Sequence, residues 1–145
     1  MKNIVIAAGF ATKLYPLAES SPNPQLEIGN SIILGRLLDD IDEHIIITSH
    51  KFAQIFKESE NKQPYTKPIT VIDDETKTND TRLGAVKDLQ VTIDSCNVDD
   101  NMMVVVTDNI LDFSLQGFVD FFKEKDTSVI MCHNEPELKK LQRAP

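Results

Sequence analysis

The sequence lacks several features that would place it in common functional classes. No apolar run in its 145 residues approaches the ~20 residues of a membrane-spanning helix, and the first run is too short for a signal peptide. We therefore expect no contact with a membrane. Lys and Arg total 15 against 23 Asp and Glu, which gives a net charge of −8. Nucleic-acid binding needs a basic surface, so this balance argues against it.

Cysteine and glycine are also scarce, and each shortage excludes particular chemistry. Cys96 and Cys132 are far apart and form no C-x-x-C pair, so a reducing cytoplasm is the expected location. A dinucleotide-binding turn needs G-x-G-x-x-G, whereas the turn after the first apolar run contains only Gly9. The Gly-Lys-Ser/Thr ending of a phosphate-binding P-loop does not occur. Both of these familiar phosphate cradles are therefore excluded.

The most informative stretch that remains is the apolar run at residues 4–8 with the loop that follows it. Such a run predicts a strand buried on both faces, at the centre of a parallel sheet. About fifteen loop-prone residues follow, and open α/β sheets bind ligands at the carboxyl ends of their strands. Small residues at Ala7, Ala8 and Gly9 would let a flat or anionic ligand approach the backbone. Thr12 adds a hydroxyl and Lys13 the loop's only positive charge. The alternative is an ordinary long connection, and the residues alone do not decide between the two.

Further along, the apolar patterns alternate between those of strands and those of helices. Strands are predicted at residues 44–48, 69–72, 102–106 and 128–133. Helices are predicted at residues 33–41, at 51–59, from about 82 onward, after a Ser114 cap, and at 135–143. This alternation is typical of parallel βαβ units. We predict a single domain over residues 1–145, with a three-layer α/β/α sandwich around a mostly parallel sheet.

Two positions stand out because of where they lie relative to these elements. Gly84 falls near the start of a predicted helix with Leu83, Val86 and Leu89 on one face, and the residues favour a helix glycine at a close packing site. Asp108 follows the strand at residues 102–106, where a carboxylate is well placed to hold Mg²⁺. The alternative for Asp108 is an ordinary turn or helix cap.

The order of these motifs resembles the N-terminal part of the sugar-phosphate nucleotidylyltransferases. The stretches IVIAAGFATKLYPL and SPNPQLEIGNSIIL are similar to that family's LAAGxGTRLxPLT and PKPLLxIxxKPIL patterns. The resemblance continues through DDETKTNDTRLGAVKDLQ, VVVTDNILDFSL and GFVDFFKEKDTSVI, so it covers nearly the whole chain. It implies a Rossmann-like fold of the nucleotide-diphospho-sugar transferase type, shortened at its C-terminal end.

The resemblance also implies an activity and a set of site residues. The reaction would be Mg²⁺-dependent and would convert a nucleoside triphosphate and a sugar 1-phosphate into a nucleotide sugar and pyrophosphate. Nucleotide contacts would come from Ala7, Ala8, Gly9, Thr12 and Gly84, with Gly84 in the base-contacting turn. The positions of the family's catalytic arginine and lysine are held by Lys13 and Asn23, and that of its metal-binding aspartate by Asp108.

Four signature positions depart from the family pattern. Ala11 and Thr107 stand where the family has glycine, Lys13 where it has arginine, and Asn23 where it has lysine. Lysine keeps the charge of arginine but loses the planar fork that grips phosphate, and asparagine keeps a hydrogen-bond donor but no charge. Losing one group that stabilises a transition state typically costs on the order of 10²–10³ in rate.

The second metal-binding aspartate that the resemblance implies has no counterpart before residue 145. Three interpretations therefore stay open. The chain is an impaired nucleotidylyltransferase, a non-catalytic relative that binds nucleotide or a protein partner, or a truncated or redesigned fragment that keeps only the fold.

Overall fold

The structure is a computed structural model, and it describes residues 1–10, 22, 27–28, 31–38, 43–60, 68–107, 111, 113–132, 134 and 136. The strands predicted near the amino terminus and at residues 44–48, 69–72 and 102–106 are all confirmed. The elements are, in chain order, β1 (Lys2–Ala7), β2 (Glu27–Ile28), β3 (Ser31–Ile32), α1 (Ile33–Leu38), β4 (His44–Thr48), α2 (His50–Glu60), β5 (Ile69–Asp73), the 3₁₀ helix η3 (Asn79–Thr81), α3 (Ala85–Cys96), β6 (Met102–Val106) and α4 (Leu115–Lys125).

The central element is β1, which is hydrogen-bonded to a parallel strand on each side. The sheet has the order β5-β4-β1-β6, and every pair in it is parallel. The chain therefore runs outward from β1 through β4 to β5, and then crosses back to place β6 on the other side of β1. This arrangement confirms the predicted α/β class with a Rossmann-like parallel sheet. A separate antiparallel pair, β2 with β3, flanks residues 29–30.

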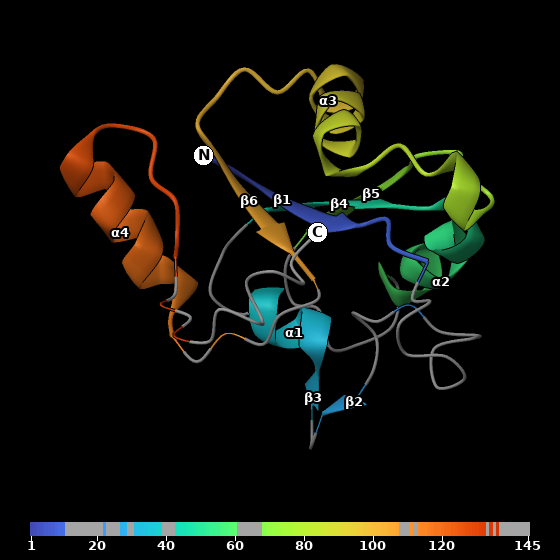
Figure 1. Ribbon diagram of the computed structural model, residues 1–145, viewed down its shortest axis with the longest axis horizontal. Coiled ribbons are helices and arrows are strands. Elements are labelled where there is room, and N and C mark those ends of the chain that lie inside the picture. Colours follow the sequence, from blue (N-terminus) through green and yellow to red (C-terminus); the bar gives the residue numbers. More distant parts are fainter. Residues whose placement is uncertain are drawn as a thin grey trace.

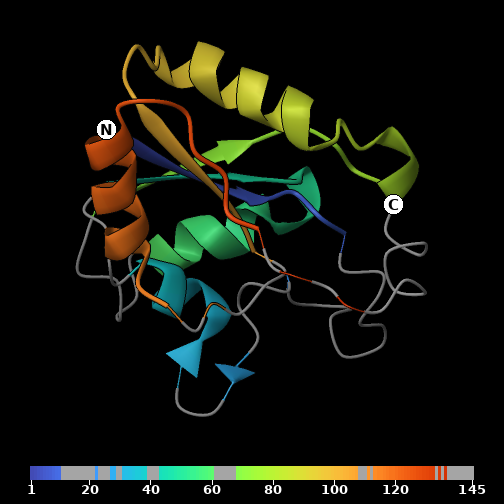
Figure 2. The same ribbon diagram turned by 60° about the vertical axis from the view of Figure 1, so that its left-hand side comes forward.

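Helices cover both faces of the sheet, as the predicted three-layer sandwich requires. Figures 1 and 2 show α1 and α2 on one face and α3 on the other. The face under α1 and α2 is apolar, and its buried cluster consists of Val5, Ala7, Leu34, Ile46, Phe52 and Phe56. A smaller cluster fixes α4 against β6 and α1, and it consists of Leu37, Met103, Leu115 and Val119. Burial of these side chains is the main stabilising contribution to the fold.

Local signals in the sequence set the ends of α3 and α4. Ser114 caps α4 as predicted, because its Oγ accepts a hydrogen bond of 3.1 Å from the Gln116 amide. Both helices end at a residue in the left-handed conformation, Asn97 at φ 47° and Asp126 at φ 48°. Such residues let the chain turn away while an amide still bonds the last helical turn. No helix in the described part of the chain is long and apolar enough to cross a bilayer.

Two predictions about the second half of the chain are wrong. Residues 128–132, the described part of the predicted strand at 128–133, are not in a strand, and the Ile130 side chain is 85% exposed. A strand needs a hydrogen-bonded partner as well as suitable residues. β6 is therefore the edge of the described sheet, and Met102, Val104 and Val106 are partly exposed on it. The helix predicted at 135–143 lies outside the described residues, apart from residue 136.

The second error concerns the inner face of α3. Val86, which was predicted to share an apolar face with Leu83 and Leu89, is 84% exposed. The residues buried against the sheet are Asp88 and Thr92 instead. These two are four positions apart and so share one side of the helix. The hydrophobic periodicity failed here because the buried side of α3 is polar.

The apolar core makes a direct prediction about stability. Phe52→Ala should lower the free energy of unfolding by about 3–5 kcal/mol, because the ring is fully buried between α2 and the sheet. Chemical denaturation of the two proteins measures this loss. Phe121→Ala on α4 is the matched control, since that ring is exposed and should cost far less. Equal losses for both variants would contradict the assigned core.

Candidate functional site

The candidate site lies at the carboxyl edge of the sheet, where the register brings the strand ends together. Ala7 is paired with Thr48, Thr48 with Asp73, and Ile6 with Val106. The end of β1 is then fixed from both sides by threonine side chains. The Thr48 hydroxyl donates to the Ala7 carbonyl at 3.4 Å, and the Thr107 hydroxyl donates to the Ile6 carbonyl at 3.2 Å. The carboxyl end of β1 is thereby fixed to β4 on one side and to the residue after β6 on the other.

The topology singles out the gap between β1 and β6 at this edge. The chain leaves β1 toward β4 and later returns on the opposite side as β6, which makes this gap the switch point of the sheet. Ligands of open α/β folds bind outside the carboxyl ends of strands at such a point. The structure places Ala7, Ala8 and Gly9 there, and Gly9 is exposed. Among the described residues, nothing lies within 4 Å of a side-chain carbon added to Gly9, so that side of the residue is open to a ligand.

The loop after β5 lies at the same carboxyl edge of the sheet. The Asp74 amide donates to the Thr48 carbonyl at 2.9 Å, and the His50 amide donates to the Thr76 carbonyl at 3.0 Å. Asp74 Oδ1 accepts from both the amide and the hydroxyl of Thr76, at 2.7 and 2.6 Å. His50 Nδ1 lies 2.7 Å from Asp73 Oδ2. These contacts hold the loop to the start of α2.

Gly84, the predicted base-contacting residue, starts α3 beside this loop. Its φ of 87° and ψ of 154° belong to a conformation that only glycine adopts without strain. In the part of the chain that the structure describes, a side-chain carbon added to Gly84 would meet nothing within 4 Å. The expected close packing site is therefore wrong: glycine is needed here for its backbone conformation, and its backbone faces open space. The Asp88 amide donates to the Gly84 carbonyl at 3.0 Å and so links this turn to the helix.

Three buried polar side chains at this edge were not predicted from the sequence. Asp74 is 7% exposed, Asp88 is 3% exposed, and Ser49 is fully buried. One oxygen of each, Asp74 Oδ2, Asp88 Oδ1 and Ser49 Oγ, has no hydrogen-bond partner among the residues that the structure describes. Burial, reinforced by the charge of Asp74, raises the pKa of Asp88 to about 6. A hydrophobic pattern assigns charged residues to the outside, so nothing in the sequence marked Asp88 as buried.

Several of the predicted site residues lie outside the described residues, namely Thr12, Lys13, Asn23 and Asp108. Thr107, which precedes Asp108, is described and nearly buried. Its hydroxyl is bonded to the β1 backbone, so its side chain is directed at the sheet. Within the described ranges, no group of three or more His, Cys, Asp or Glu side chains is arranged to hold a metal ion.

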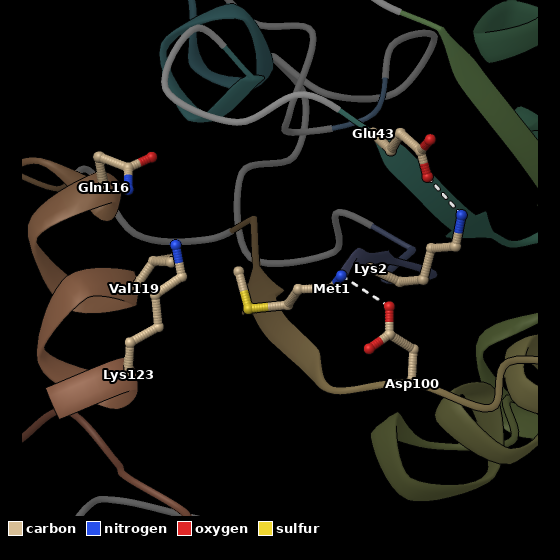
Figure 3. A pocket seen from close by; sticks show the side chains of 7 residues that line it. All are labelled: Met1, Lys2, Glu43, Asp100, Gln116, Val119 and Lys123. Carbon is tan, nitrogen blue, oxygen red and sulfur yellow. Dashed lines mark hydrogen bonds and ion pairs between the residues drawn. The ribbon is translucent and has the colours of Figure 1, made fainter. Parts of the chain in front are cut away.

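A cavity of about 450 Å³ lies at the opposite, amino end of the strands. It is lined by Met1, Lys2, Glu43, Asp100, Gln116, Val119 and Lys123. Figure 3 shows that its acidic groups are paired: the Met1 amino group lies 2.6 Å from Asp100, and Lys2 forms an ion pair with Glu43. The hydrogen bond and charge of Glu43 raise the pKa of Lys2, and those of Lys2 lower the pKa of Glu43. None of the predicted site residues that the structure describes lines this cavity, so it is separate from the described part of the candidate site.

The fold and this edge together define an α/β protein with a Rossmann-like parallel sheet. The sequence matches the nucleotidyl transferase family over residues 2–140, and the chain belongs to that family. A comparison with proteins of curated function finds no match.

Solved structures show the same fold at low sequence identity. A UDP-glucose pyrophosphorylase in complex with UDP-glucose is 13% identical with a TM-score of 0.66, and the match covers 86% of this chain and 54% of that one. A glucose-1-phosphate thymidylyltransferase from Bacillus anthracis, described as putative, is 20% identical with a TM-score of 0.66, covering 86% and 50%. HddC from Yersinia pseudotuberculosis is 17% identical with a TM-score of 0.64, covering 83% and 53%. The chain spans about half the length of these proteins.

The conformation of Gly84 can be tested by a single methyl group. Gly84→Ala should lower the free energy of unfolding by about 1–3 kcal/mol, because alanine is strained at this φ although space is available for it. Gly117→Ala, inside α4 with equally open space, should instead raise it by roughly 0.5–1 kcal/mol. Changes of the same sign in the two variants would contradict the conformation assigned to Gly84.

The raised pKa of Asp88 makes stability depend on pH. The folded protein holds this proton up to about pH 6, whereas the unfolded chain releases it near 3.8, so stability is lost as the pH rises between these values. The difference corresponds to about 3 kcal/mol. Asp88→Asn should therefore be more stable than the parent by on the order of 1–3 kcal/mol at pH 7.5 and by little at pH 4.5. Denaturation at both pH values measures this, with the exposed Asp94→Asn on the same helix as control. If the difference in unfolding free energy between the parent and Asp88→Asn is the same at both pH values, the raised pKa assigned to Asp88 is wrong.

Proposed function

We propose that the chain binds a nucleoside triphosphate at the carboxyl edge, with its phosphates over Ala7, Ala8 and Gly9 and its base against the Gly84 turn. The observation that carries this proposal is the open backbone at Gly9, located at the switch point of the sheet. Amide groups of small residues are suited to phosphate, because they donate hydrogen bonds without a side chain in the way. The open backbone of Gly84 supports the same pose, since a flat base can lie against it.

We further propose that the reaction is nucleotidyl transfer to a sugar 1-phosphate or a similar phosphorylated acceptor. An acceptor phosphate oxygen forms a bond to the α-phosphorus, the bond from that phosphorus to the β-phosphate oxygen breaks, and pyrophosphate leaves. Two polyanions must approach each other, so positioning and positive charge supply most of the catalysis. Lys13 supplies charge in the loop after β1, and Asn23 supplies a hydrogen-bond donor. We expect this pair to support only slow turnover.

Mg²⁺ is the metal that this chemistry would use, and Asp108 is the residue proposed to hold it. Mg²⁺ is usually bound by one or two carboxylates together with substrate phosphates and water, so one aspartate beside bound phosphates suits it. When bound, it would neutralise phosphate charge. The ordered end of β6 supports this assignment, because the bond from Thr107 to the β1 backbone fixes the residue directly before Asp108.

The alternative function is nucleotide binding without turnover, or binding of a protein partner. It is favoured by the altered signature positions, of which Lys13 and Asn23 bear directly on catalysis. The substitution at Thr107 does not argue for it, since that hydroxyl is bonded to the Ile6 carbonyl of the sheet. We place either activity in the reducing cytoplasm, consistent with the free thiols of Cys96 and Cys132.

The first test is calorimetric titration with ATP, GTP, CTP and UTP, each with and without Mg²⁺. Saturable binding of one nucleotide is expected, and it should be weakened in Gly84→Ala because the methyl group intrudes on the base. The absence of binding to protein shown to be folded would overturn the proposal.

The second test restores the family's charged groups. The double variant Lys13→Arg/Asn23→Lys should release pyrophosphate on the order of 10²-fold faster than the parent. Both proteins are supplied with glucose 1-phosphate, Mg²⁺ and the nucleotide that binds in the first test. Lys123→Arg/Asn101→Lys makes the same changes at the opposite end of the strands and should not raise the rate. If the first double variant gains nothing over this control, Lys13 and Asn23 are not the catalytic positions.

A further inference from the structure

We propose that the cavity at the amino end of the strands is a second binding site, and that its ligand is a small organic anion, an apolar body with a carboxylate or phosphate group. This cavity of about 450 Å³ is enclosed by α4 on one side and by residues at the amino ends of β1, β4 and β6 on the other. Small-molecule sites typically have volumes of about 300–1,000 Å³. Because it lies at the other end of β1 from residues 7–9, the inference does not depend on the proposed function.

The lining of this cavity differs in charge from the chain as a whole. Three cationic groups line it, the Met1 amino group, Lys2 and Lys123, against the two carboxylates of Glu43 and Asp100. The whole chain carries a net charge of −8. A locally positive hollow in an acidic protein attracts anions and disfavours cations. The charge of the lining therefore points to an anionic ligand.

Both carboxylates of the cavity are already occupied. Asp100 Oδ2 lies 2.6 Å from the Met1 amino group, and Asp100 Oδ1 accepts a hydrogen bond of 2.6 Å from the Asn101 amide. These two hydrogen bonds lower the pKa of Asp100, and the hydrogen bond and charge of Lys2 lower the pKa of Glu43. A cationic ligand would have to displace one of these partners, whereas an anionic ligand leaves both pairs intact.

Lys123 is the cationic group that remains for a ligand. In the described part of the chain no ion pair includes Lys123, whereas Lys125 on the same helix is paired with Glu124 at 2.7 Å. Figure 3 shows the Lys123 side chain extending along α4 past Val119, toward the side of the cavity where the Met1 side chain ends. An ammonium group in this position can bind a carboxylate or phosphate oxygen as a point charge.

An apolar surface lies beside this ammonium group. Gln116, Val119 and Lys123 are three and four positions apart, so they share one side of α4 and form one wall of the cavity. Val119 belongs to the apolar cluster that fixes α4 against β6 and α1. The Met1 side chain on the opposite wall is flexible and can adapt to an apolar or aromatic body. An organic anion would use both the apolar surface and the charge, whereas an inorganic ion would use only the charge.

The experiment follows the backbone amide chemical shifts of isotope-labelled protein during titration with benzoate, phenyl phosphate and the neutral benzamide. We expect saturable shifts with at least one anion at residues 1–2, 100–101 and 115–125, and none with benzamide. A response to one anion alone supports the site and identifies its anionic group. The inference would be overturned by the absence of saturable shifts, by shifts confined to residues 7–9 and 84, or by equal affinity for benzamide.

Two substitutions at the end of α4 form a matched pair. Lys123→Gln and Lys125→Gln each remove one positive charge from the last turn, where both charges interact favourably with the helix dipole. Both side chains are exposed, so neither change should prevent folding. Lys123→Gln should weaken anion binding about 10-fold, since it removes a hydrogen bond to a charged group. Lys125→Gln should bind nearly as tightly as the parent.

A third variant separates the charge of Lys123 from its shape. Lys123→Arg keeps the positive charge at the cavity, so it should retain most of the affinity that Lys123→Gln loses. The affinity of the parent should also fall as salt is added, because the ammonium group is partly screened. Equal losses in Lys123→Gln and Lys125→Gln would show that the anion responds only to the overall charge of α4, and would overturn the assigned site.

Discussion

The rest of the structure depends on the burial of β1 with a parallel strand on each side. A strand in this position must be apolar on both faces, and its backbone must be paired on both edges. The hydroxyls of Thr48 and Thr107 reinforce this pairing at the last residues of the ladder, because they bond the Ala7 and Ile6 carbonyls. The turn at Ala8 and Gly9 therefore emerges from a fixed base. A site that recognises phosphate by backbone amides needs this rigidity, since amides of a mobile loop would have to be ordered at the moment of binding.

The two faces of the sheet are packed with different kinds of side chain. Under α1 and α2 the contact is a packed apolar cluster, which provides stability and tolerates no polar group. Under the first turns of α3 the contact is polar, with Asp88 and Thr92 turned toward the strands. Such a contact is weaker, because buried carboxylates lose water without gaining an equivalent partner. Stability is therefore unevenly distributed, and the low-stability region coincides with the edge where the ligand is proposed to bind. Regions that must respond to ligands are usually found at this end of the stability range.

The sequence was sufficient for the fold and for the place of the turn after β1. Continuous apolar runs predicted all four paired strands of the sheet, because a strand buried on both faces leaves a strong signal. The turn at Ala7–Gly9 was predicted for the same reason, as its place follows from the end of β1. The sequence could not show whether Gly84 is required for its backbone conformation or for close packing. The residue type alone reveals neither the φ angle nor the space around the residue. The burial of Asp74 and Asp88 was missed because it depends on tertiary packing, which periodicity does not contain. The strand at 128–133 was predicted wrongly because its residues suit a strand while pairing depends on the whole sheet.

The exposed edge of β6 has a consequence for the behaviour of the protein in solution. Alternate residues Met102, Val104 and Val106 form an exposed apolar row on one face of this edge strand, which contains no charge or proline. Natural sheets normally protect such edges, because an unpaired strand is a template for strands of other molecules. Here the opposing influence is the net charge of −8, which keeps molecules apart over long distances. Salt shortens that range to about 8 Å at physiological ionic strength. Raising the ionic strength should therefore favour self-association through β6.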